Sequence, residues 1–311
     1  MASAYDVPTT EELDSLFEEL SNWTRWGTED ERGTLNLLTD ERRTAAAALV
    51  STGESVSLAH DLATEPMSDH PHPVHHHMLA AGDARDADGI EGYEAARDHL
   101  ALDVHGLWTT HVDALSHMFV RGRMYGGRPA SDVRSDGARS NTVLSMADGV
   151  IGRGVLLDVP RTLGVGFLEG TDVVTVADLE ATEAAQGVRV GPGDIVLVAW
   201  GREARRNATR RFDGFSGLHP ECLRWLAERD VAVLGSDGIS DPMPFLGTPQ
   251  WPFPIHQIGI VAMGLPLLDN ARLADLGSRC AEAGRWEFLF TMAPLRITRG
   301  TGCPVNPVAL L

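Results

Sequence analysis

The sequence predicts a single large domain of the α/β class, in which strands and helices are mixed. Short runs rich in Val, Leu and Ile predict buried strands at Val150–Asp158, Asp194–Trp200 and Val231–Ser236. Segments of helical periodicity lie between or after these runs, at Thr175–Gln186, Pro220–Arg229 and Asn270–Ala283. The alternation is too uneven for a plain doubly wound sheet. With 311 residues, 43% of them hydrophobic, the chain is long enough to bury such a core.

The N-terminal region predicts two helices joined by a loop. The first helix begins at Thr10 and has apolar residues at helical spacing. A glycine-punctuated loop over residues 23–36 follows, and Thr39 is placed to cap a second, alanine-rich helix over Asp40–Val50. We therefore expect residues 1–50 to form an N-terminal helical arm.

Residues 51–311 are expected to form the main domain. The alternation over Ser55–His60 predicts a strand, and Glu287–Ile297 is strand-like near the other end of the chain. Residues 61–99 show no regular pattern. Within them, Asp69–His77 (DHPHPVHHH) is predicted to be a loop because of its prolines, either a simple polar loop or one whose histidines line a pocket.

Charge and composition narrow the possible partners. Lys and Arg number 26 against 44 Asp and Glu, so the formal net charge is −18. Such a surface repels phosphate backbones and anionic membranes, which argues against nucleic-acid and membrane partners. The three cysteines form no C-x-x-C pair, and no run approaches the ~20 apolar residues that span a bilayer. We expect a cytoplasmic protein with reduced thiols.

The segment from His105 to His117 carries the clearest chemical signal. If residues 111–113 are extended, the side chains of His111 and Asp113 point to the same side. An imidazole and a carboxylate then converge as ligands for a metal such as Zn²⁺ or Mn²⁺. His117 follows four residues after Asp113 and is suited to act as an acid or base, since its unperturbed pKa is ~6.5. The alternative is a polar turn in which these groups only satisfy hydrogen bonds.

The sequence TTHVDALSH in this segment resembles the metal-binding signature of the cyclase family, roughly H-x-G-T-H-x-D-x-P-x-H-F. This family includes bacterial kynurenine formamidases and isatin hydrolases. Thr110, His111, Asp113 and His117 match the signature, and Phe119 falls one place late. Three further segments resemble family motifs in the right order: residues 26–36, 235–241 and 293–305. The resemblance therefore covers most of the chain.

The resemblance implies a mixed, barrel-like β core with flanking helices, of the swivelling β/β/α type. It also implies a homo-oligomer, a dimer or tetramer, that acts on a small molecule. The expected activity is metal-dependent hydrolysis of an amide, lactam or lactone bond in a small cyclic or aromatic substrate. Two alternatives remain open, a cyclase or dehydratase that uses the same metal site and a catalytically inactive binding protein with this fold.

Two departures from the family pattern bear on the metal. Leu107 stands where the two-zinc members have a histidine, and Gln257 stands twelve residues before Asp269, where the pattern has a second histidine. The resemblance then favours the isatin-hydrolase-like branch, with about one Mn²⁺ per chain, or alternatively Zn²⁺, held by His111, Asp113 and Gln257. Asp269 is expected beside these ligands, unless it only caps the following helix.

The remaining candidates surround this centre. His117 is expected to be the catalytic group that takes a proton from water and returns it to the leaving group. His105 is expected to support the ligands or to replace one of them. A substrate-binding role is predicted for Trp26, Trp108, Phe119 and His256.

Overall fold

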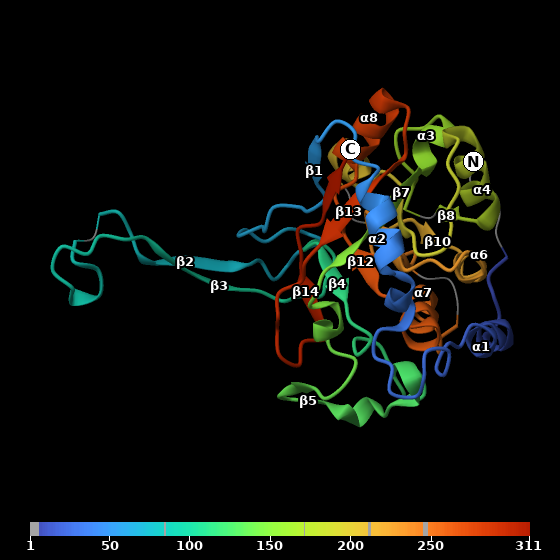
Figure 1. Cartoon of the computed structure of the whole chain (residues 1–311), viewed down its shortest axis with the longest axis horizontal. Helices are drawn as coiled ribbons and strands as arrows, with labels where there is room; N and C mark the ends of the chain where they lie inside the picture. The colour runs from blue at the N-terminus through green and yellow to red at the C-terminus, as the bar shows by residue number, and fades with distance from the viewer. Residues whose placement is uncertain (1–5, 84, 171, 211–212, 245–247) are drawn as a thin grey trace.

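The computed structural model describes residues 6–83, 85–170, 172–210, 213–244 and 248–311. It confirms the predicted α/β class, with one curved, mixed sheet and helices packed around it (Figure 1). In spatial order, the nine strands of the sheet are β1 (Ser55–Ser57), β15 (Val308–Leu310), β13 (Glu287–Met292), β7 (Val150–Asp158), β9 (Ile195–Ala199), β11 (Val233–Ser236), β12 (Leu267–Asp269), β4 (His111–Asp113) and β14 (Gly302–Pro304).

The centre of the sheet is parallel, and its two edges are antiparallel. β7, β9, β11 and β12 run parallel, and β13 and β4 are the antiparallel neighbours on either side. The central strands are buried on both faces, as their apolar composition predicts. In β7, for example, Val155 and Leu157 belong to one core cluster, while Leu156 between them belongs to the other. The two cores lie on opposite faces of the sheet, since successive side chains alternate.

The helices cover these two cores. Their bounds are α1 (Thr10–Glu19), α2 (Asp40–Ala47), α3 (Val159–Leu163), α4 (Val176–Gln186), α5 (Arg202–Thr209), α6 (Cys222–Glu228), α7 (Pro254–His256) and α8 (Ala274–Ala283). Side chains of α1, α4 and α6 enter one core, and side chains of α8 enter the other. The threonines just before α1, α2 and α4 accept a backbone hydrogen bond from the first turn, so these helices begin where N-cap residues predict.

Shorter elements complete the described chain. A π-helix, η6 (Gln257–Met263), continues directly from α7. The 3-10 turns are η1 (Gly33–Leu37), η2 (Ala87–Gly89), η3 (Tyr125–Gly127), η4 (Ala130–Asp132) and η5 (Val143–Met146). The small strand pairs are β8 (Val173–Val174) with β10 (Gly217–Leu218), and β5 (Val133–Arg134) with β6 (Gly137–Ala138).

The N-terminal segment is tied to η6. The backbone N–H of Asn22 donates to the carbonyl of Ala262, and the backbone N–H of Thr34 donates to the carbonyl of Gly264 at the end of η6. Gly33 has a φ of +54°, and a Cβ at this position would lie 2.1 Å from the carbonyl oxygen of Gly264. The loop after α1 therefore supports the helix pair α7–η6. The division into an N-terminal arm, residues 1–50, and a main domain, residues 51–311, remains a prediction.

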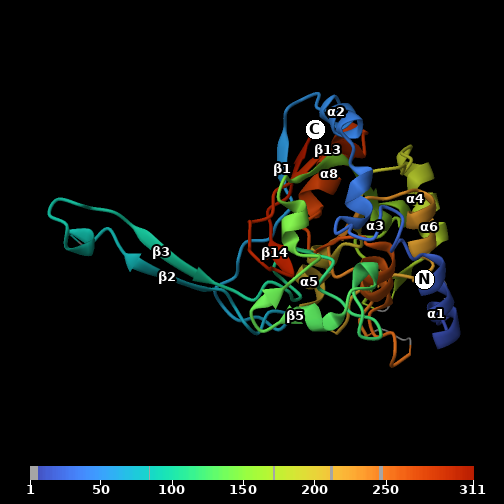
Figure 2. The same ribbon diagram turned by 60° about the horizontal axis from the view of Figure 1, so that its bottom comes forward.

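The prediction that His75–His77 belong to an irregular loop is wrong. These histidines begin β2 (His75–Ala80), which pairs antiparallel with β3 (Arg97–Ala101) in a hairpin that extends away from the body (Figures 1 and 2). The prolines lie before the strand, so they end the loop without entering the ladder. The three histidine side chains are exposed.

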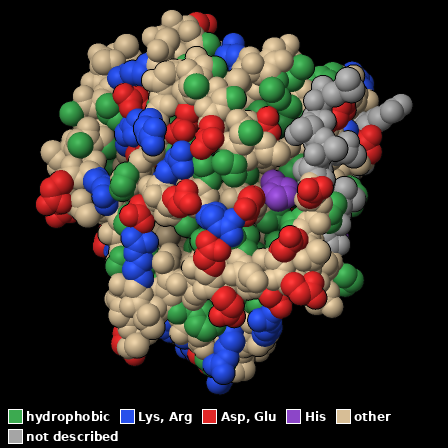
Figure 3. Space-filling view, turned by 90° about the vertical axis from the view of Figure 1, so that its right-hand side faces the viewer, with side chains coloured by type: hydrophobic (Ala, Val, Ile, Leu, Met, Phe, Trp, Pro, Cys, Tyr) green, Lys and Arg blue, Asp and Glu red, His purple; other side chains and the backbone are tan. Residues whose placement is uncertain are grey.

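One face of the molecule shows how its charges are distributed. On the face drawn in Figure 3, acidic side chains are dispersed, with basic side chains between them. Among the described helices, none combines the length and the apolar composition that crossing a membrane requires.

Candidate metal centre

β4 lies between β12 and β14 and brings the motif histidine and aspartate into the interior. His111 pairs with Asp269 of β12 on one side and with Pro304 of β14 on the other. Residues 111–113 are extended, which is the condition for His111 and Asp113 to share one side of the strand while Val112 enters the core on the other side. The Asp113 side chain is completely buried.

One oxygen of Asp113 faces two imidazoles. Oδ1 lies 3.0 Å from Nδ1 of His105 and 3.5 Å from Nε2 of His111. Nδ1 of His111 lies 2.8 Å from the carbonyl oxygen of Thr109, so this nitrogen carries the proton and donates it. In the neutral ring Nε2 then has a lone pair directed at a carboxylate oxygen. Two facing acceptors require a cation between them, either a proton or a metal ion.

The other oxygen of Asp113 faces a second group. Oδ2 lies 3.5 Å from Nε2 of His256, which also lies 3.2 Å from Oδ2 of Asp269. On its opposite side, His256 Nδ1 lies 2.6 Å from Oδ2 of Asp241. This carboxylate also accepts hydrogen bonds from the backbone N–H groups of Ile255 and His256, which fixes the start of α7. The arrangement is a carboxylate–histidine pair of the kind that orients a metal ligand.

His117 lies at the rim of the cluster. Its ring stacks on that of His105 with centroids 3.8 Å apart, and its Nε2 lies 4.0 Å from Oδ2 of Asp113. The side chain is 24% exposed, in contrast to the buried His111. Burial lowers the pKa of His117 to about 4, although the Asp113 carboxylate acts in the opposite direction. The ring is therefore neutral at pH 7 and able to accept a proton.

The buried charges of the cluster do not balance. Burial raises the pKa of Asp113, but the imidazoles of His117, His105 and neighbouring histidines outweigh it and hold that pKa well below its usual range. Burial lowers the pKa of His256, but the carboxylates of Asp269 and Asp241 raise it further than burial lowers it. Three carboxylates, those of Asp113, Asp241 and Asp269, are buried around the His256 ring, and burying carboxylates is costly unless cations offset their charge.

These residues fit a divalent metal ion. Ligand atoms ~2.1 Å from a tetrahedral ion are roughly 3.4 Å apart, close to the 3.0–3.5 Å separations around Asp113. Among the described residues, two groups place their ligand atoms within 4.8 Å of one another: His105, His111 and Asp113, and Asp113, His256 and Asp269. Oδ2 of Asp113 and Oδ1 of Asp269 have no hydrogen-bond partner in the described part of the chain. Asp113 belongs to both groups.

Gln257 is engaged elsewhere. Its Oε1 accepts from the backbone N–H of Phe253 at 3.1 Å, and its Nε2 donates to the carbonyl of Gln250 at 3.3 Å. The predicted ligand thus hydrogen-bonds the chain before it, and the preceding residue, His256, faces Asp113. Asp269, expected beside the ligands, is one of the group.

The aromatic candidates are dispersed. Trp26 is half-buried against the core that contains Leu156, with the Arg25 guanidinium 4.7 Å from its ring centroid. Trp108 stacks with His60 at 4.6 Å, and the Arg206 guanidinium lies 4.4 Å from its ring. Phe119 is 39% exposed, two residues after His117. Phe119 is therefore the most exposed of the three aromatic candidates.

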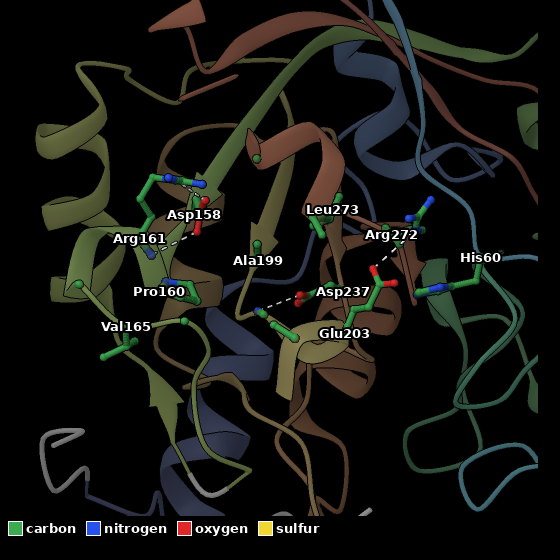
Figure 4. A pocket seen from close by; sticks show the side chains of 17 residues that line it. His60, Asp158, Pro160, Arg161, Val165, Ala199, Glu203, Asp237, Arg272 and Leu273 are labelled. Atoms are coloured by element: carbon green, nitrogen blue, oxygen red, sulfur yellow. Dashed lines mark hydrogen bonds and ion pairs between the residues drawn. The ribbon is translucent and has the colours of Figure 1, made fainter. Parts of the chain in front are cut away.

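A separate cavity of about 410 Å³ opens at the carboxyl ends of β7 and β9 (Figure 4). The ligand candidates around Asp113 do not line it. Arg161 pairs with Asp158 at 2.9 Å and Arg272 with Glu203 at 3.4 Å, while Asp237 accepts three backbone hydrogen bonds. Each acidic side chain among the described lining residues therefore has a basic or backbone N–H partner.

Two residues of the site were not recognised from the sequence. Asp241 lies within the matched motif at residues 235–241, but the pattern alone did not show which histidine it would orient. Helical periodicity in the sequence predicts a helix that begins at Asn270, whereas Asn270 has a left-handed backbone conformation after β12 and α8 begins at Ala274.

Comparison with known proteins places the fold and the family. A family model described as "Putative cyclase" matches residues 55–241, more than half of the chain. A crystal structure of a novel cyclase has 30% sequence identity and a TM-score of 0.83, over 95% of this chain and 99% of that one. Comparison with curated protein sequences gives no match.

More distant structures share the fold. Isatin hydrolase A from Labrenzia aggregata, bound to benzyl benzoate, has 21% identity and a TM-score of 0.57, over 85% of this chain and 94% of that one. A predicted metal-dependent hydrolase from Bacillus stearothermophilus has 18% identity and a TM-score of 0.52, over 82% of this chain and 97% of that one. The family match and the 30% identical structure together show that the chain belongs to the cyclase family.

Proposed function

We propose that the protein is a metal-dependent hydrolase that opens an amide, lactam or lactone bond in a small molecule. The observation that carries this proposal is the position of Asp113, whose two buried oxygens each face an imidazole nitrogen from a different part of the chain. Burying a carboxylate costs free energy unless a cation offsets its charge.

The donor set favours two ions that share Asp113. His105 and His111 would hold the first with Oδ1, while His256 and Asp269 would hold the second with Oδ2. The sequence predicted about one ion because of Leu107 and Gln257, but His105 and His256 supply imidazoles that these residues lack. When bound, such ions lower the pKa of water and polarise a carbonyl group. Three imidazoles and two carboxylates suit Zn²⁺ and Mn²⁺ alike.

His117 is proposed to act as the general base and then as the general acid. It is neutral, lies at the exposed rim, and is held by stacking on His105. From this position it can accept a proton from water and return it to the leaving nitrogen or oxygen. Phe119 is proposed to contact the substrate beside it.

The substrate class rests on the relatives of the same fold, which include isatin hydrolases. We propose a cyclic amide, cyclic imide or lactone, and isatin is the first compound to test. A homo-oligomer also remains a prediction. The exposed apolar residues of the hairpin region, Met78, Leu79, Ile90 and Leu100, are the surface to examine for it.

The experiment is a substrate screen with metal-free protein, reloaded with Mn²⁺ or with Zn²⁺. Isatin, N-formylkynurenine, cyclic imides and lactones are tested in ¹⁸O-labelled water. Metal-dependent turnover with ¹⁸O in the product supports the hydrolase. Turnover that releases water supports a cyclase or dehydratase, and tight metal binding without turnover on any compound supports a binding protein.

A further inference from the structure

Asn270 lies directly after the ligand Asp269 and is completely buried. Its φ of +54° places it in the left-handed region, which asparagine tolerates better than most residues. Its side-chain Nδ2 donates to two carbonyl oxygens, that of Gly106 at 2.9 Å and that of Thr109 at 3.1 Å. Its own carbonyl accepts from the hydroxyl of Thr110 at 2.6 Å. All these contacts are with the short loop that joins His105 to His111.

The carbonyl of Thr109 connects Asn270 to a metal ligand. The same oxygen accepts from Nδ1 of His111 at 2.8 Å. Asn270 therefore fixes the acceptor that decides which nitrogen of His111 carries the proton and which faces Asp113. Groups that hydrogen-bond a metal ligand in this way set its orientation and its affinity for the ion.

Arg202 holds Asn270 from the other side. Its Nη1 donates to Oδ1 of Asn270 at 2.6 Å, and its Nη2 donates to the carbonyl of Leu107. The Arg202 side chain is 9% exposed and faces the buried carboxylate of Asp69 at 3.4 Å. Asp237 fixes the start of α5 by accepting from the backbone N–H groups of Trp200, Gly201 and Arg202.

We infer that Asn270 is a positioning residue of the metal centre, and that with Arg202 it holds the loop Gly106–Thr110 so that His105 and His111 converge on Oδ1 of Asp113. The inference rests on the proposed metal centre. It requires two donors on one buried side chain, which asparagine has and aspartate lacks. Asn270→Asp keeps the size and the tolerance for positive φ but removes both donors.

The test separates the two ligand groups. His256→Ala leaves the group of His105 and His111, and His111→Ala leaves the group of His256 and Asp269. Zn²⁺ affinity is measured by competition with a chromophoric chelator in each background, with and without Asn270→Asp. We expect the substitution to weaken binding ~10–100-fold in the His256→Ala background and to change it less than about threefold in the His111→Ala background.

Asn141→Asp is the matched control. Asn141 is also completely buried, has a φ of +56°, and donates to a backbone carbonyl, that of Tyr125 at 2.9 Å. Asn141→Asp should lower the melting temperature without weakening Zn²⁺ binding more in one background than in the other. If Asn270→Asp does not fold, Asn270→Gly, which keeps the backbone conformation, gives the same comparison.

Equal losses in both backgrounds, or none in either, would overturn the positioning role. If the unsubstituted protein binds only Mn²⁺, the same comparison is made with Mn²⁺. If it binds neither Zn²⁺ nor Mn²⁺, the proposed metal function fails, and that result is distinct from a failure of the role of Asn270.

Discussion

Nε2 of His256 lies 3.5 Å from Oδ2 of Asp113 and places a residue of the α7–η6 helix pair opposite a residue of the sheet. Asp241 holds the far side of the same ring at 2.6 Å. His256 and Asp113 come from segments that are far apart in the sequence. The N-terminal loop is hydrogen-bonded to η6, which continues from α7.

The first prediction distinguishes two adjacent residues. His256→Gln should remove one of two bound ions, because it removes the imidazole that faces Asp113. Gln257→Ala should keep both, because its amide is bonded to Phe253 and Gln250. Elemental analysis of the two purified variants measures the difference. A loss of metal in Gln257→Ala with full retention in His256→Gln would restore Gln257 as the ligand.

His117→Ala should reduce turnover ~10²–10⁴-fold, as expected for loss of a general acid or base, while both ions stay bound. The reason is that His117 lies at the rim, 4.0 Å from Asp113, where it contacts the ligands without belonging to either group. Turnover and metal content are measured on the same preparation, and His76→Ala in the exposed hairpin is the control. Loss of metal together with activity would make His117 a ligand.

The stability of the fold should depend on the protonation of His60. Burial and the nearby Arg202 and Arg272 lower its pKa to about 4. Between pH 4 and 6.5 the unfolded chain then binds more protons than the folded one, so the stability contributed by neutral His60 is lost as pH falls through this window. From pH 7 to pH 5 the loss should be ~1–2 kcal/mol.

Urea unfolding at both pH values, on wild type and His60→Gln, measures this contribution. The variant should lose less stability than wild type over the same interval. An identical pH dependence in the two proteins would show that the His60 pKa is not lowered by folding.

A fourth prediction concerns the contact that supports η6. Gly33→Ala places a Cβ 2.1 Å from the Gly264 carbonyl oxygen, whereas Gly53→Ala, also at positive φ, meets nothing within 4 Å. Both substitutions incur the left-handed strain of about 1–2 kcal/mol. Gly33→Ala should destabilise by a further ~1–3 kcal/mol through the clash. Equal unfolding free energies for the two variants would argue against a close contact at Gly33.

Several parts of the fold follow from local rules in the sequence. The strands β7, β9 and β11 were predicted because continuous apolar runs are typical of strands buried on both faces. The convergence of His111 and Asp113 was predicted because side chains two apart share one side of a strand. These signals depend only on neighbouring residues, and the structure agrees with them.

The residues that face Oδ2 of Asp113 could not be predicted from their spacing in the sequence. Twelve residues before Asp269 is Gln257, but the residue that faces Asp113 is His256. The intervening chain contains the π-helix η6, and which side chain of such a turn faces Asp113 depends on tertiary packing that a spacing in the sequence does not specify. The bonds of Asn270 and Arg202 are likewise tertiary contacts without a local pattern.

The most direct test of the account is the number of metal ions bound with and without the charge of Asp113. Metal-free wild type and Asp113→Asn are titrated with Zn²⁺ and with Mn²⁺ by calorimetry, and the bound metal is counted by elemental analysis. The asparagine keeps the shape of the side chain but removes the shared negative charge. We predict two ions per wild-type chain for at least one of the metals, and loss of both in Asp113→Asn. A wild type that binds neither metal, or an Asp113→Asn variant that binds as many ions as wild type, would contradict a metal centre organised around Asp113.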